Sequence, residues 1–216
     1  MSLSLHLQSL HRQDRLLLSG VDLHVAAGQI LTVMGPSGCG KSSLLAAIAG
    51  LESDRLHLQG TLHLHGQRIT HLPTEQRRIG LLFQDDLLFA HWTVGENLLF
   101  AVPAGPLHAR WAAVHQALAQ ADLAGYADRD PATLSGGQRA RVALLRALLA
   151  QPRALLLDEP FARLDTALRV PLRAWVYAHL REQGIPALLV THDPSDIADA
   201  GHVWHWPRLE SPSAHA

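Results

Sequence analysis

Residues 29–49 read QILTVMGPSGCGKSSLLAAIA, which indicates a strand, a loop and a helix in that order. Residues 29–34 form a short run with β-branched side chains, which is typical of a strand. Glycines and a proline follow at once, and residues 41–49 then favour a helix. Residues 35–42 match the pattern G-x-x-x-x-G-K-[ST], which requires this order of strand, loop and helix. The stretch therefore predicts a phosphate-binding loop.

The chemistry of such a loop assigns roles to its residues. Backbone N–H groups at a helix N-terminus converge on phosphate oxygens, helped by the helix dipole, and glycine leaves room for that approach. Lys41 is predicted to bridge the β- and γ-phosphates, while the Ser42 hydroxyl binds Mg²⁺. The predicted nucleotide-binding residues are Gly35, Pro36, Ser37, Gly38, Cys39, Gly40, Lys41, Ser42 and Ser43.

A second motif at residues 155–159 is an apolar strand, Leu-Leu-Leu, that ends in Asp158 and Glu159. Parallel sheets bind ligands at the carboxyl ends of their strands. We expect Asp158 to hold Mg²⁺, and Glu159 to act as general base for the attacking water, because consecutive side chains leave a strand in opposite directions. The structural alternative is an acidic pair at a helix N-terminus ahead of Pro160.

Hydrophobic periodicity predicts two kinds of sheet. Leu and Val residues alternate with polar neighbours at positions 3–7, 21–25 and 62–64, which indicates half-buried antiparallel strands. Short apolar runs at 153–157 and 186–190 are separated by a helical pattern. This second arrangement is typical of a parallel sheet covered on both faces.

The middle of the chain is predicted to be helical. Thr93 and Glu96 have the spacing of a capping box, which begins a helix that Pro103 ends. Apolar residues at helical spacing predict an amphipathic helix at about 107–124, and Ser135 caps a further helix.

Together these patterns predict an α/β fold. It has a P-loop NTPase core with a parallel sheet flanked by helices, an N-terminal antiparallel β layer and an inserted helical subdomain. We expect one domain over residues 1–216, with the core at about 1–84 and 150–210 and the helical subdomain at about 85–149.

Composition excludes several classes of protein. The chain has 18 Lys plus Arg against 19 Asp plus Glu, a balance that argues against nucleic acid as a partner. No run of about 18 apolar residues is present, so no membrane-spanning helix is expected. A single cysteine, Cys39, and an N-terminus without signal-peptide features indicate the cytoplasm.

Residues 134–138, LSGGQ, identify a family: the chain resembles the ATP-binding cassette (ABC) ATPases, in which this sequence is the signature motif. The other family motifs occur in the family's order over nearly the whole chain. They are the phosphate loop at 35–42, a Q-loop at 82–85, the signature at 134–138, LLLDEP at 155–160, a D-loop at 162–165 and a switch histidine within 190–193.

The resemblance implies that two copies pack head to tail, with each ATP between the phosphate loop of one copy and the signature of the other. In that arrangement Ser135, Gly136, Gly137, Gln138 and Asp165 act on the partner's ATP. A hydroxyl, backbone amides and a helix dipole at one N-terminus suit a γ-phosphate.

The resemblance also implies roles within one copy. Gln84 reaches Mg²⁺ and the attacking water, and His192 contacts the γ-phosphate. The expected catalytic residues are thus Glu159, His192 and Gln84, and the expected Mg²⁺ ligands are Ser42, Gln84 and Asp158.

Two segments depart from the family pattern. An aromatic residue commonly stacks on adenine near position 12, but this chain reads His11-Arg12-Gln13 there. His11 or Arg12 could stack in its place. The D-loop is often S-A-L-D, whereas this chain has Ala162 and Arg163 in the first two positions.

Residues 83–100, FQDDLLFAHWTVGENLLF, resemble the corresponding segment of bacterial importer subunits for thiamine, polyamines, sulfate or iron. That likeness implies transmembrane permease subunits and a periplasmic solute-binding protein as partners, and a peripheral place on the inner face of the cell membrane. The apolar residues Leu87, Leu88, Phe89 and Trp92 could receive a coupling helix of the permease. Ordinary core packing of these side chains is the alternative.

Other functions stay open. A lone cassette subunit also serves exporters, lipoprotein-release complexes and cell-division complexes. The 15 histidines, with His63 near His65 and His202 near His205, raise the possibility of a metal-binding module. A metal site needs three or four converging ligands, and these pairs have no Cys or carboxylate at ligand spacing.

Overall fold

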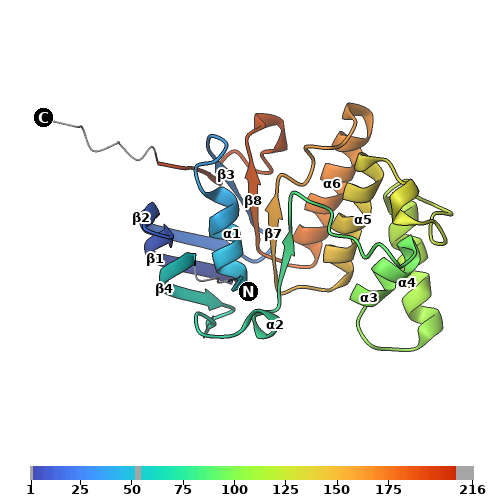
Figure 1. Ribbon diagram of the computed structural model, residues 1–216, viewed down its shortest axis with the longest axis horizontal. Helices are drawn as coiled ribbons and strands as arrows, with labels where there is room; N and C mark the ends of the chain where they lie inside the picture. The colour runs from blue at the N-terminus through green and yellow to red at the C-terminus, as the bar shows by residue number, and fades with distance from the viewer. Residues whose placement is uncertain (1, 52–54, 208–216) are drawn as a thin grey trace, which may run out of the picture.

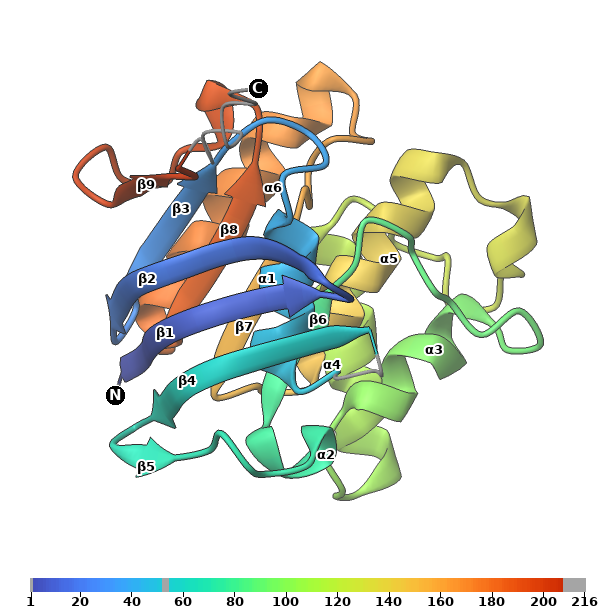
Figure 2. The same ribbon diagram turned by 60° about the vertical axis from the view of Figure 1, so that its left-hand side comes forward.

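The computed structural model describes residues 2–51 and 55–207 of the chain. Its centre is a five-stranded parallel sheet with the strand order β6-β7-β8-β3-β9 (Figures 1 and 2). These strands are β3 (Ile30–Met34), β6 (Ile79–Leu82), β7 (Ala154–Asp158), β8 (Ala187–Thr191) and β9 (Val203–His205). All five residues of β7 and of β8 are buried, as expected for a parallel sheet covered on both faces.

A second, antiparallel sheet confirms the predicted β layer. Its order is β2-β1-β4-β5, with β1 (Ser2–Arg12), β2 (Arg15–Ala26), β4 (Leu56–Leu64) and β5 (Gln67–Arg68). Leu3, Leu5 and Leu7 on β1 are buried and point to one face. Figure 2 shows this sheet lying across helix α1 (Lys41–Ala49), which separates it from the parallel sheet.

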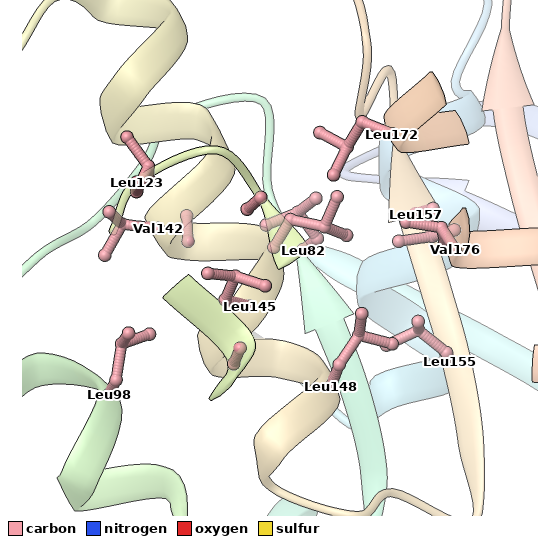
Figure 3. Packing of buried hydrophobic residues seen from close by; sticks show 14 of the residues in the cluster. Leu82, Leu98, Leu123, Val142, Leu145, Leu148, Leu155, Leu157, Leu172 and Val176 are labelled. Atoms are coloured by element: carbon pink, nitrogen blue, oxygen red, sulfur yellow. The ribbon is translucent and has the colours of Figure 1, made fainter. Parts of the chain in front are cut away.

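Two hydrophobic clusters cover the two faces of the parallel sheet. Leu156 of β7 belongs to the cluster around α1 and the antiparallel sheet, whereas Leu155 and Leu157 belong to the cluster formed with the helices on the other face. Figure 3 shows this second cluster, where Leu155 and Leu157 lie near Leu148 and Val176. Alternate residues of one strand thus hold both layers together.

The helices of the second face come from the middle and the later part of the chain. They are α3 (Val94–Ala101), α4 (Leu107–Gln120), α5 (Gly136–Leu149) and α6 (Thr166–Glu182). Figure 1 shows α3 and α4 at the end of the molecule farthest from the antiparallel sheet, with α5 and α6 between them and the parallel sheet. Short α2 (Thr74–Arg77), η1 (Pro131–Thr133) and η2 (Pro194–Asp196) complete the description.

Capping predicted from the sequence is present, and one helix boundary was wrong. Thr93 accepts a hydrogen bond from the Glu96 N–H, and the Glu96 carboxylate accepts one from the Thr93 N–H, so the capping box is confirmed. The helix expected to reach Ala124 ends at Gln120. Asp122 has a left-handed φ of 55°, and this turn carries Leu123 back into the core, where it is fully buried.

Within residues 2–51 and 55–207, the structure contains no helix with the length and apolar character needed to cross a bilayer.

Candidate active site

The predicted phosphate loop joins the carboxyl end of β3 to the first residue of α1. Gly38 and Gly40 have φ of 76° and 118°, values in the left-handed region that favours glycine. At Gly35, a Cβ would lie 2.7 Å from the Cβ of Trp206, so only glycine fits there. Gly40 is the N-cap of α1 and has no side chain to accept hydrogen bonds from the first turn. These N–H groups therefore remain available to an anion.

Lys41 is buried beneath this loop. Its side chain is 5% exposed, and Nζ donates hydrogen bonds to the carbonyl oxygens of Gly35 at 2.9 Å and of Pro36 at 2.8 Å. A buried ammonium needs such partners, and a phosphate would be a stronger one. Lys41 therefore has the location and the charge that a bound triphosphate requires.

Ser42 and Asp158 form a second part of the site, where β7 ends. Burial raises the pKa of Asp158, while a hydrogen bond from Ser42 opposes that rise. Glu159 adds to the rise, and Lys41 opposes it. A hydroxyl beside a buried carboxylate is a ligand set that Mg²⁺ accepts, and the ion would offset the unfavourable burial of the charge. These residues fit the magnesium ion that the motif implies.

Replacing Asp158 by asparagine is expected to stabilise the nucleotide-free protein. Because the pKa of Asp158 is raised in the folded chain, the ionised carboxylate opposes folding at neutral pH, and stability is lost as the pH rises through that pKa. Asp158→Asn should raise Tm at pH 7 by about 2–4 °C, the change that about 1 kcal/mol produces in a chain of this length.

Calorimetry at pH 7 and at lower pH measures this effect, which should shrink as the pH falls. The further stabilisation by MgATP should disappear in the same variant. Asp14→Asn, at an exposed turn, serves as the control. A lower Tm for Asp158→Asn at pH 7 would show that the ionised carboxylate stabilises the folded protein.

Glu159 and His192 meet at the carboxyl edge of the sheet. The Nδ1 atom of His192 lies 3.0 Å from Oε1 of Glu159, with the carboxyl side chain 16% exposed and the imidazole 58% exposed. Glu159 leaves β7 with a left-handed φ of 48°, while its N–H donates to the carbonyl of Val190. A non-glycine residue held in this conformation is strained, which is common at active sites.

Gln84 follows β6 and faces the same region. A cavity of about 20 Å³, room for one water, is lined by Gln84, Glu159 and neighbouring residues. Arg163 also lines this cavity, and its guanidinium pairs with Asp85 at 3.0 Å. The structure thus brings together the three expected catalytic residues, since His192 contacts Glu159.

The signature motif lies at the N-terminus of α5. Ser135 is exposed and is the N-cap of α5, where its hydroxyl accepts from the Gln138 N–H at 3.2 Å. A Cβ on Gly137 would lie 3.1 Å from the carbonyl oxygen of Arg163, so the D-loop backbone passes close to this glycine. Asp165 is exposed as the N-cap of α6. These residues face outward rather than contacting Lys41.

One histidine of each pair has an ordinary polar partner. His202 pairs with Asp199 at 2.7 Å, and the ring of His65 contacts the Arg153 carbonyl, with its pKa lowered by burial. Over the described part of the chain, no three His, Cys, Asp or Glu side chains are arranged to hold a metal ion. His11, at the expected adenine position, is half-buried on β1 beside exposed Arg12.

Comparisons with known proteins agree on one family. A family model described as "ABC transporter" matches residues 18–162. The chain is 55% identical over 190 residues to the uncharacterised ABC transporter ATP-binding protein YnjD of Escherichia coli strain K12, and the match covers 88% of each protein. It is 44% identical to a sulfate/thiosulfate import ATP-binding protein of Gloeobacter violaceus, covering 84% of this chain and 53% of that protein.

A third relative is the Fe(3+) ions import ATP-binding protein of Escherichia coli strain K12, at 40% identity over 83% of this chain and 51% of that protein. The chain therefore spans about half the length of these two import subunits.

Solved structures show the same fold. A dimeric structure of the bacterial ABC transporter cassette MJ0796 aligns with a TM-score of 0.81 at 26% identity, covering 94% of each chain. Its post-hydrolysis state bound to ADP and Pi gives a TM-score of 0.78 at 28% identity, covering 91% of this chain and 90% of that one. The chain belongs to the ABC transporter family, as one of its ATP-binding cassette ATPases.

Proposed function

We propose that this ATPase subunit powers the import of a small solute, working as a head-to-tail dimer beneath transmembrane permease subunits. The observation that carries the catalytic part is the Glu159–His192 contact beside buried Asp158, at the carboxyl edge of the parallel sheet. This is the edge at which an α/β sheet binds its ligand.

Each residue of the site has a chemical task in hydrolysis. The N–H groups of the loop and Lys41 would hold the phosphates, and Ser42, Asp158 and Gln84 would hold the magnesium ion. Bound Mg²⁺ supplies positive charge to the phosphate oxygens. Glu159 accepts a proton from the attacking water, which Gln84 orients. His192 fixes the Glu159 carboxylate through Nδ1 and offers the rest of its ring to the γ-phosphate.

The exposed signature supports a second copy as the partner. Ser135 is exposed, and the space beside Gly136 is open, since the nearest atom to a Cβ there would be 3.9 Å away. The two structures of MJ0796 are both dimeric. In the proposed dimer, Ser135, Gly136, Gly137, Gln138 and Asp165 complete the ATP site of the other copy.

An aromatic cluster after the Q-loop supports a permease partner. Phe89, Trp92 and Phe100 have ring centroids 4.6 to 5.5 Å apart and are 41%, 38% and 63% exposed. Fully buried Asn97 holds this loop, because its amide bonds with the backbone of Phe89 at 2.8 and 3.1 Å. A rigid, exposed aromatic surface is suited to receive an apolar helix.

Leu88 instead packs against the buried hydrophobic cluster, so ordinary core packing explains this residue.

Replacing Trp92 by alanine tests this surface. Permease binding should weaken at least tenfold, because a central aromatic anchor is lost, while the ATPase rate of the isolated protein should stay unchanged. Leu107→Ala is the matched control, since Leu107 is 59% exposed on α4, outside the aromatic cluster. Co-purification with a co-expressed permease partner measures the effect, and undiminished capture of Trp92→Ala would exclude this surface.

Import is favoured by the relatives, two of which are named as import subunits for sulfate/thiosulfate and for Fe(3+) ions. In this proposal the protein lies on the cytoplasmic face of the membrane and a periplasmic solute-binding protein delivers the solute. Reconstitution with the permease in vesicles tests the direction. Import predicts that solute moves toward the side that holds the ATPase, whereas movement away from it would favour an exporter.

A further inference from the structure

A buried carboxylate, that of Asp196, lies next to the segment that carries the switch histidine. Asp196 ends η2, four residues after His192, and is 1% exposed. Arg169 donates to it twice, from Nε at 3.1 Å and from Nη2 at 2.6 Å. Arg173, one turn further along α6, donates from Nη1 at 3.2 Å. Two guanidinium groups thus hold one carboxylate in the interior.

Asp196 and Arg169 also contact the two residues next to His192. The Thr191 hydroxyl donates to Oδ2 of Asp196 at 3.1 Å, and Nη2 of Arg169 lies 2.7 Å from Oδ2 of Asp193. The Asp193 N–H in turn donates to the Thr191 hydroxyl at 3.1 Å. The residues on each side of His192 therefore belong to one hydrogen-bond network, and the imidazole itself contacts Glu159.

Burial makes this network important for the stability of the local structure. Exposed ion pairs contribute little, but a buried charge that loses a partner is strongly destabilising. The Asp196 side chain is 2% exposed, and those of Arg169 and Arg173 are each 19% exposed. The pKa of Arg169 is raised, with its hydrogen bond to Asp196 as the largest cause. These three groups consequently favour a single arrangement.

Arg169 also connects this network to the D-loop. It lies in the first turn of α6, and its N–H donates to the carbonyl of Asp165 at 2.9 Å. A displacement of the D-loop would move this first turn, and with it the guanidinium that holds Asp193 and Asp196.

We propose that Asp196 and Arg169 are positioning residues for His192, which hold the switch histidine against Glu159 and link its place to that of the D-loop. The inference rests on the proposed role of His192 in hydrolysis. Its geometric content, however, can be measured without any turnover.

The experiment follows the ring of His192 by NMR in protein labelled at histidine, with its signal assigned by loss in His192→Ala. In Asp196→Asn, the Nδ1 signal should move to the position that it has in Glu159→Ala, where the carboxylate contact is absent. Asp199→Asn is the matched control, because Asp199 pairs with His202 and the Gly201 N–H and has no contact with residues 191–193. Its His192 signal should stay unchanged.

Turnover gives the second readout. Misplacing a catalytic group by about 1 Å can reduce turnover about 100-fold, so kcat in Asp196→Asn should fall about 10- to 100-fold while ADP affinity stays within about twofold. Thr191→Val removes only one hydroxyl and keeps the side-chain shape and the buried charges. It should move the same signal if Asp196→Asn does not fold.

A His192 signal that stays in place in every folded variant would overturn the positioning role. Wild-type hydrolysis by His192→Ala would instead overturn the proposed catalytic role of the histidine. The two failures are therefore distinguishable.

Discussion

Glu159→Gln is expected to abolish ATP turnover and to leave ATP binding intact. The glutamine keeps the shape of the side chain and can still accept a hydrogen bond from His192, but it cannot take a proton from water. Loss of a positioned general base typically reduces the rate about 10²- to 10⁴-fold. Phosphate release under saturating MgATP measures turnover, and a fluorescent ATP analogue measures binding.

Glu182→Gln is the matched control, since Glu182 is exposed at the end of α6, away from the site. Hydrolysis by Glu159→Gln at the wild-type rate would mean that another group activates the water.

Lys41→Ala is expected to weaken ATP binding at least 100-fold. The substitution removes the ammonium that would face two phosphates, and it leaves the carbonyls of Gly35 and Pro36 without this donor. Charge-assisted hydrogen bonds are among the strongest in proteins, which is why a large effect is expected.

Unchanged affinity for the ATP analogue in Lys41→Ala would place the nucleotide elsewhere.

The fold could be predicted where its signals are local. The strand, loop and helix at 29–49, the capping box at Thr93 and the cap at Ser135 rest on neighbouring residues, and the structure confirms them. The short strands β5, β6 and β9 were not predicted, because two to four residues give no periodicity. The end of α4 was misplaced because Leu123 continues the helical spacing but reaches the core through a turn.

In the site, too, local patterns could be predicted and long-range contacts could not. The motif residues could be found from their sequence patterns and from the family resemblance, but their partners could not. Arg163 pairs with Asp85 over a separation of 78 residues, and Arg169 with Asp196 over 27. Phe100 joins Phe89 and Trp92 because α3 turns its aromatic ring toward them. Such contacts arise from tertiary packing, which a single sequence does not encode in any local pattern.

In the proposed dimer, each ATP needs the phosphate loop of one copy and the signature of another. Light scattering of Glu159→Gln, with and without MgATP, measures this requirement. The mass of one chain should become that of two when MgATP is added, and adding Ser135→Arg should keep the protein monomeric while it still binds ATP. A Glu159→Gln protein that stays monomeric with ATP bound, or a dimer that persists with Ser135→Arg, would contradict the account.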